Sequence, residues 1–167
     1  LTDTEMKNLA KDCDAIVSCL GHVMDFKGIF GSPRKLCTDA TQRFCEAIEK
    51  NSPSIPIKFI LMNTVGVGNP DLEESRTFFD KGLLALLHYT LPPHRDNETA
   101  MEYLYRFVGK NSSYIEWCSV RPDSLINADL SPYTIKESPA SSILKGHPTS
   151  RSNVACFMAE LIEDAEL

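Results

Sequence analysis

The sequence predicts an α/β fold built on a parallel sheet, and three short apolar runs are the observations that predict it. These runs span residues 15–20, 57–62 and 114–120. Each ends abruptly, at a glycine, an asparagine and an arginine respectively. Segments with the apolar spacing of amphipathic helices lie between them. The order strand, helix, strand, helix, strand is typical of parallel sheets, which bind ligands where their strands end.

Five helices are predicted around these runs, from the spacing of their apolar residues. They cover residues 3–11, 33–50, 71–88, 97–109 and 151–162. The residues expected to cap their first turns are Thr2, Ser32, Asp96 or Asn97, and Ser150. The helix over residues 71–88 is expected to pack through an apolar side that starts at Phe78 and Phe79.

Two connecting stretches have no regular spacing. Residues 22–32 are expected to form a loop that exposes Phe26, Ile29 and Phe30. Residues 123–146 are expected to be irregular apart from a short strand at residues 133–135.

Composition and charge are those of an ordinary globular protein. Of the 167 residues, 43% are hydrophobic and 24% are charged, which is enough for one domain spanning residues 1–167. The formal net charge of −6 argues against nucleic acid and anionic membranes as partners. No apolar run approaches the roughly 20 residues that a membrane span needs.

The six cysteines include no CxxC pair, and several lie in apolar strand or helix patterns. Buried free thiols in a reducing compartment are favoured over disulfides or metal ligands, so a cytoplasmic location is expected. The four histidines show no metal-ligand spacing, and no metal site is predicted.

Candidate binding residues stand at the three strand ends. They are Cys19, Leu20, Gly21 and His22 after the first run, Asn63 and Thr64 after the second, and Arg121 and Pro122 after the third. Gly21 either lets a flat or phosphorylated ligand approach the backbone or makes a tight turn. Thr64 either offers its hydroxyl to a ligand or caps a turn. Arg121 either reaches over the crevice or pairs with a surface acid.

Four segments, taken in order, resemble an atypical short-chain dehydrogenase/reductase of the NAD(P)H-binding, NmrA-like kind. They are residues 14–21, residues 59–64 with Gly66, residues 120–122, and residues 150–155. The resemblance implies a Rossmann-like, doubly wound parallel sheet and an NAD(P) cofactor. It also implies that the crevice for cofactor and substrate is lined near Gly21, near Thr64 and by the loop after Pro122.

The chain departs from that family in two respects. The family's first strands and their glycine-rich diphosphate loop have no counterpart here, so we expect the chain to be the carboxyl-terminal part of a larger domain. Residues 15–20 are then an open apolar sheet edge, so either the rest of the domain was lost or another chain covers the edge. The family's tyrosine–lysine pair is also missing, and His94 and Glu98 stand at its positions. A histidine acts as an acid near neutral pH, but the negative charge of Glu98 does not replace a lysine cation.

Three functions stay open at this point. The first is an NAD(P)-dependent oxidoreductase acting on a small, partly apolar substrate, in which Thr64 binds the substrate carbonyl and His22 or His94 gives the proton. The second is a regulator of the NmrA type that binds the dinucleotide without turnover. The third is an interaction module that uses the loop over residues 26–30 and the open sheet edge. The first ranks slightly above the second, because many atypical relatives reduce substrates without the tyrosine–lysine pair.

Overall fold

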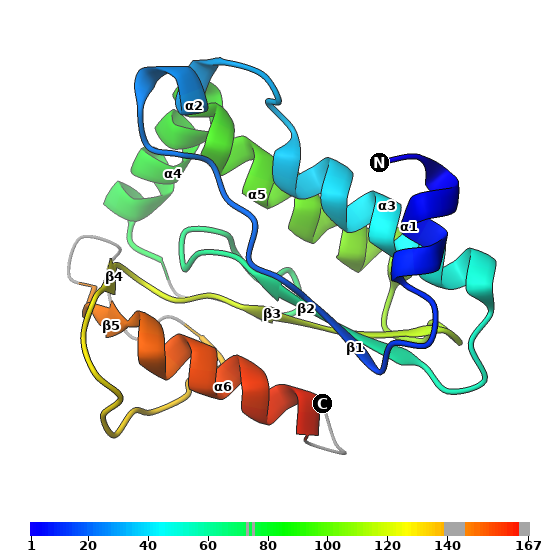
Figure 1. The fold of residues 1–167 in the computed structure, drawn as a ribbon. Coiled ribbons are helices and arrows are strands. Elements are labelled where there is room, and N and C mark those ends of the chain that lie inside the picture. Colours follow the sequence, from blue (N-terminus) through cyan, green and yellow to red (C-terminus); the bar gives the residue numbers. More distant parts are fainter. Residues whose placement is uncertain (73, 75, 139–145, 164–167) are drawn as a thin grey trace.

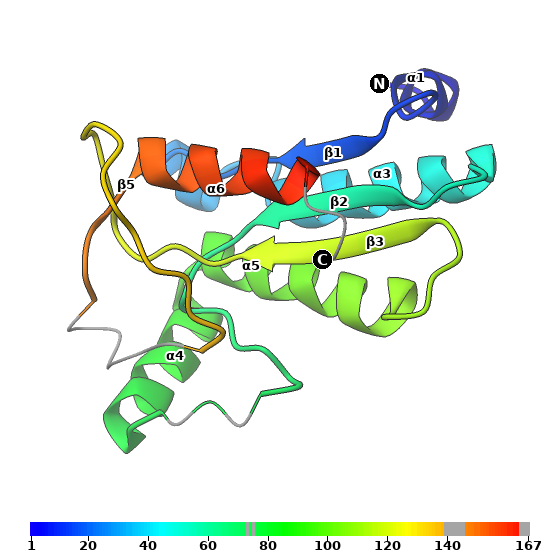
Figure 2. The ribbon, with the colours of Figure 1, turned by 90° about the horizontal axis from the view of Figure 1, so that it is seen from below.

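A three-stranded parallel sheet forms the centre of the computed structural model, which describes residues 1–72, 74, 76–138 and 146–163. The strands lie in the order β1-β2-β3, and all three point the same way (Figure 2). They are β1 (Ala15–Ser18), β2 (Ile57–Met62) and β3 (Ile115–Val120). The fold is therefore α/β and Rossmann-like, as the three apolar runs predict.

Helices cover both faces of this sheet (Figure 1). One face carries α1 (Asp3–Leu9), α3 (Leu36–Asn51) and α5 (Pro92–Tyr103), and the other carries α6 (Arg151–Glu163). Because side chains alternate along a strand, neighbouring residues of β2 enter different cores. Phe59 packs on the α3 and α5 side and Ile60 on the α6 side. Both are fully buried, and each contributes about 2 kcal/mol relative to an exposed side chain.

Several local expectations are confirmed. The first helix begins at Asp3 behind a complete capping box formed by Thr2 and Glu5. Ser150 accepts a hydrogen bond from the Asn153 amide and opens α6. The helix predicted over residues 97–109 continues from α5 through a π-helical turn, Leu104–Val108, and stops at Gly109. Gly109 has a φ of +69°, a conformation that glycine adopts without strain.

The predicted starts of three helices are wrong. The helix expected at residue 33 begins at Leu36, and the helix expected at residue 71 is α4 (Phe78–Thr90), capped by Thr77. Helix α5 starts at Pro92, because two consecutive prolines suit a first turn whose amides need no partner. Asp96 therefore lies inside α5 and does not cap it.

The two connecting stretches also differ in part from the expectation. The loop over residues 22–32 contains a short helix, α2 (Phe26–Phe30), capped by Asp25. Residues 133–135 form no strand; instead, the Tyr133 hydroxyl donates to Glu160 of α6. The short strands in this part are β4 (Leu125–Ile126) and β5 (Thr149–Ser150), which pair in parallel.

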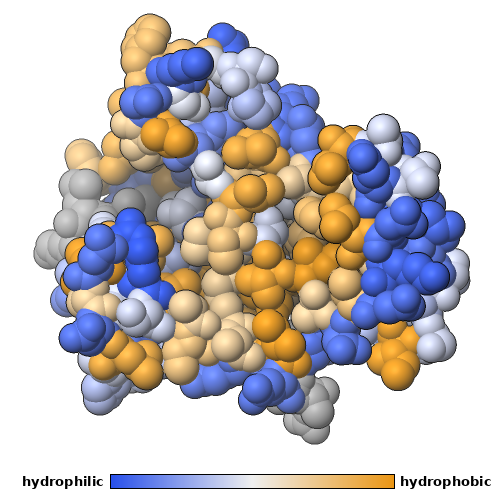
Figure 3. Space-filling model, viewed as in Figure 1, coloured by the Kyte–Doolittle hydropathy of each residue, from blue (hydrophilic) through white to orange (hydrophobic). Residues whose placement is uncertain are grey.

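Apolar side chains remain exposed on two parts of the surface. On α4, the predicted packing side is largely open to solvent, with Phe78 94% and Phe79 65% exposed. Apolar residues also gather on the face of the molecule where β1 is the outer strand (Figure 3). Val17 and Leu20 are 37% and 42% exposed there. Among the described strands, β1 pairs with β2 alone, so its outer edge carries unpaired backbone groups.

Within the part of the chain that the structure describes, no helix combines the length and the apolar character that crossing a membrane requires.

Candidate functional site

The carboxyl ends of β2 and β3 continue side by side beyond the sheet. The Asn63 amide donates to the Val120 carbonyl at 2.8 Å, and the Val65 amide donates to the Pro122 carbonyl at 3.1 Å. The turn after β2 is therefore fixed against the end of β3. Ligands bind at such strand ends in open α/β sheets.

Asp96, a buried residue of α5, closes the same end of the molecule by capping a different helix. Its Oδ2 accepts from the Cys37 amide at 2.8 Å, and its Oδ1 accepts from the Thr38 amide at 3.0 Å and the Thr38 hydroxyl at 2.6 Å. These amides belong to the first turn of α3, whose N-cap, Lys35, makes no side-chain bond. A carboxylate at this place also complements the positive end of the helix dipole.

His22 joins the same cluster from the segment after β1. Its Nε2 lies 2.8 Å from Asp96 Oδ2 and its Nδ1 lies 3.2 Å from the Gly28 carbonyl, and the side chain is only 5% exposed. Both ring nitrogens of His22 therefore face hydrogen-bond acceptors within the protein. Burial tends to raise the pKa of Asp96, but the hydrogen bonds from Thr38, His22 and Cys37 outweigh it and hold that pKa below its usual value.

His22, Cys37 and Asp96 bring their nitrogen, sulfur and oxygen atoms within 4.8 Å of one another, as a metal site would. Each of these atoms has a hydrogen-bond partner. Cys37 Sγ donates to the Leu20 carbonyl at 3.3 Å, and burial raises the pKa of this thiol to about 12. A protonated thiol and a carboxylate that already accepts four hydrogen bonds are satisfied as they stand, so we interpret the cluster as structural.

The turn after β2, which holds Thr64, packs against α5 near His94. Asn63 anchors the turn, because its amide group donates to the Asn97 carbonyl at 3.1 Å and its Oδ1 accepts from the Thr64 amide. Gly66 then packs against the His94 ring, where an added Cβ would lie 3.2 Å from Cε1. The turn that holds Thr64 therefore packs against His94 of α5 through Gly66.

Glu98 lies between two histidines. Its Oε2 is hydrogen-bonded to His88 Nδ1, and its Oε1 lies 3.3 Å from His94 Nε2. The second contact has the length of a hydrogen bond but not its geometry, so the buried His94 Nε2 has no hydrogen-bond partner among the described residues. Burial lowers the pKa of His94, and the nearby positive charge of Arg76 acts in the same direction, whereas Glu98 opposes them.

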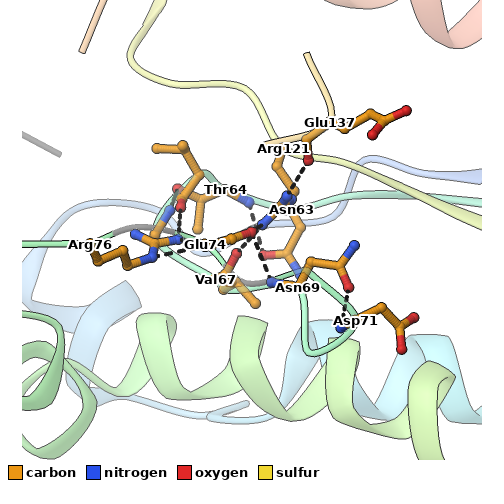
Figure 4. Close-up of polar contacts among 11 residues, drawn as sticks. Asn63, Thr64, Val67, Asn69, Asp71, Glu74, Arg76, Arg121 and Glu137 are labelled. Carbon is orange, nitrogen blue, oxygen red and sulfur yellow. Dashed lines mark hydrogen bonds and ion pairs between the residues drawn. The ribbon is translucent and has the colours of Figure 1, made fainter. Parts of the chain in front are cut away.

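A second buried cluster, Glu74 with Arg76 and Arg121, locks the rest of the turn onto β3. Arg121 Nη1 lies 2.6 Å from Glu74 Oε1, and Arg76 Nη2 lies 2.6 Å from Glu74 Oε2. Figure 4 shows the three side chains together. The two arginines also donate to the carbonyls of Val65 and Val67. Burial tends to raise the pKa of Glu74, but the two guanidinium groups lower it below its usual value. Of the two alternatives predicted for Arg121, the structure has the pairing with an acid. That acid, Glu74, is buried and does not lie at the surface.

The other predicted residues lie in the open. Cys19 and Gly21 are exposed, and Leu20 is 42% exposed. A Cβ added to Gly21 would meet no atom within 4 Å, and the residue does not have a positive φ. Neither packing nor backbone strain requires glycine at this position, which leaves room for a ligand against the backbone.

The sequence did not predict the roles of four residues in these clusters. They are Glu74, Arg76, His88, and Glu98 as the residue between two histidines. Asp96 was identified, but as the cap of the wrong helix. The contact that joins the turn to the end of β3, between Arg121 and Glu74, spans 47 positions of the chain. No local spacing signals such a pair.

A family model described as NAD(P)H-binding matches residues 1–165. The chain belongs to this NAD(P)H-binding family. Its cofactor is therefore NAD(P), and a parallel sheet with an open glycine at the end of β1 fits a flat dinucleotide. No curated protein matches the chain significantly. The sequence contains no glycine-rich diphosphate motif, so residues at the strand ends are the candidates for contact with the cofactor.

Proposed function

We propose that the protein is an NAD(P)-dependent oxidoreductase of the atypical short-chain dehydrogenase/reductase type. The observation that carries the proposal is the placement of His94, whose buried ring packs with its Cε1 against Gly66 in the turn that also holds Thr64. Buried polar atoms normally form a hydrogen bond. His94 Nε2 forms none among the described residues and has only the 3.3 Å contact with Glu98, which supports a ligand site near this ring. His22 is saturated by Asp96 and Gly28, so His94 is the better proton donor of the two candidates.

The substrate in this proposal is small and partly apolar. The Thr64 hydroxyl accepts only a long contact, 3.4 Å, from the Gly66 amide and keeps its proton for a substrate carbonyl. Val23, Met24 and Phe26 are 68–81% exposed in the segment that follows Gly21, and they offer an apolar wall. The cofactor supplies the hydride, and Thr64 and His94 orient the carbonyl and give the proton.

A non-catalytic regulator of the NmrA type is the second candidate. Glu98 favours it, because this carboxylate stands beside His94 where a lysine cation would assist proton transfer. Such a protein binds the dinucleotide and turns over nothing. A cytoplasmic location belongs to both proposals, and six free cysteines support it.

Replacing Gly21 by alanine tests the cofactor position. We expect Gly21→Ala to leave the free energy of unfolding unchanged or slightly higher, because the added Cβ meets no atom. The same Cβ would stand between the backbone and the dinucleotide, so the dissociation constant for NADPH should rise at least about tenfold. NADPH fluorescence titration measures the affinity. Gly82→Ala is the matched control, since this glycine in α4 also has open space around it. Equal affinities in both variants would contradict the assignment.

The pH dependence of turnover tests His94. The pKa of His94 is lowered, so its protonated form is scarce at neutral pH, and NADPH consumption should rise as the pH falls through a value below about 6.5. His94→Gln should lower kcat by about 10²-fold or more and flatten this profile. The exposed His147→Gln serves as the control. A panel of quinones, flavins and aldehydes supplies substrates. NADPH bound but never consumed would overturn the oxidoreductase and favour the regulator.

We also propose that a second copy of the chain covers the β1 edge. Exposed Val17 and the unpaired outer edge of β1 support this arrangement. Sedimentation velocity should show a concentration-dependent dimer, and Val17→Lys should dissociate it. Ile126→Lys, at an exposed apolar residue of β4, should leave the dimer intact. A wild-type chain that stays monomeric at all concentrations would contradict the proposal.

A further inference from the structure

A hollow of about 360 Å³ lies between the turn at residues 67–70 and the outer side of α5. This volume is within the range of pockets that bind small organic molecules. Val67, Pro70 and Met101 form its apolar wall. His88 of α4 and Glu98 of α5 form part of its polar wall. None of the predicted cofactor-binding residues lines this pocket.

The polar groups at the rim of the pocket are largely satisfied by one another. Glu102 Oε1 lies 3.0 Å from Arg106 Nε, so these two opposite charges are paired. The Tyr105 hydroxyl donates to Asp71 at 3.0 Å, and Lys110 pairs with the same carboxylate at 2.6 Å. These contacts leave no unpaired cation at the rim among the described residues.

Glu98 is different, because among the residues that the structure describes its partners are the imidazoles of His88 and His94 alone. Burial lowers the pKa of His94, and Arg76 nearby is paired with Glu74. The Glu98 carboxylate is 32% exposed, so part of it is open to a ligand. Glu98 lines the pocket with a carboxylate that, among the described residues, forms no ion pair with an arginine or a lysine.

We propose that this pocket binds a small, partly apolar molecule that carries a protonated amine, with Glu98 as its counter-ion. An ammonium group forms strong, charge-assisted hydrogen bonds with a carboxylate. The rest of the molecule packs on Met101, Val67 and Pro70, which remove apolar surface from water. The proposal does not depend on NAD(P) binding or on turnover.

Three probes of the same shape and different charge test this inference. Benzylamine is a cation at neutral pH, benzyl alcohol is neutral and benzoate is an anion. Titrations are followed by the backbone amide NMR signals of Gly68 and Met101, which belong to the pocket lining. Benzylamine should shift both signals and saturate, with an affinity at least about fivefold above that of benzyl alcohol. Benzoate should cause no saturable shift.

The Glu98→Gln variant keeps the size of the side chain and removes its charge. It should abolish the preference for benzylamine over benzyl alcohol, whereas Glu49→Gln, an exposed residue of α3, should preserve it. A preference for benzoate, a preference unchanged in Glu98→Gln, or no saturable shift with benzylamine would each overturn the proposal. Should Glu98→Gln fail to fold, the order of the three probes on the wild-type protein decides alone. NADPH affinity, measured on the same samples, reports separately on the cofactor site.

Discussion

Asp96 is the residue on which the arrangement of this structure depends. Its carboxylate joins three segments that are distant in the chain: α5, the first turn of α3 and the stretch after β1 that holds His22. All four of its hydrogen bonds come from donors that would otherwise be buried without a partner or solvated at a frayed helix end. Removing one partner from such a buried, charged network costs about 3–5 kcal/mol, which is a large share of the stability of a small protein.

Two further clusters of charged and polar side chains lie near the ends of β2 and β3. Glu74 binds Arg76 and Arg121 and fixes the turn that contains Thr64 and Gly66 against the end of β3. Glu98 links α5 to α4 through His88, and it also contacts His94 within α5. Buried charges are tolerated only when they are paired, and Glu74 meets that condition within the described residues. Their effect is to present one buried imidazole, His94, beside the turn without a hydrogen-bond partner.

The sequence predicts the sheet well because apolar, β-branched runs that end at Gly21, Asn63 and Arg121 carry a local signal. It predicts two helix starts, those of α1 and α6, because the capping residue is adjacent to the helix that it caps. It places Asp96 wrongly, because a carboxylate near a helix start has the same appearance whether it caps that helix or another one. Asp96 caps α3 across 58 positions of the chain, and only the packing of α5 on α3 creates that contact.

The second difference between prediction and structure concerns apolar side chains that are exposed. A stripe at helical spacing predicts burial, yet Phe78 and Phe79 of α4 face solvent. Periodicity reports that one side of a helix is apolar, and it does not report whether another element covers that side. The same holds for β1. Its apolar character identifies it as a strand, but does not indicate which element covers its outer edge.

Amide hydrogen exchange at Cys37 and Thr38 tests the central role of Asp96 most directly. Amides in the first turn of a helix usually exchange fast, because they have no partner within the helix. Here both donate to Asp96, so we predict protection close to that of the core strands in the wild-type protein and a large loss of it in Asp96→Asn. The loss should also appear in the wild type as the pH falls. The lowered pKa of Asp96 means that its stabilisation is complete above about pH 4 and disappears as the pH drops through the folded value. Exchange of these two amides at the rate of an unstructured chain at neutral pH would contradict the account.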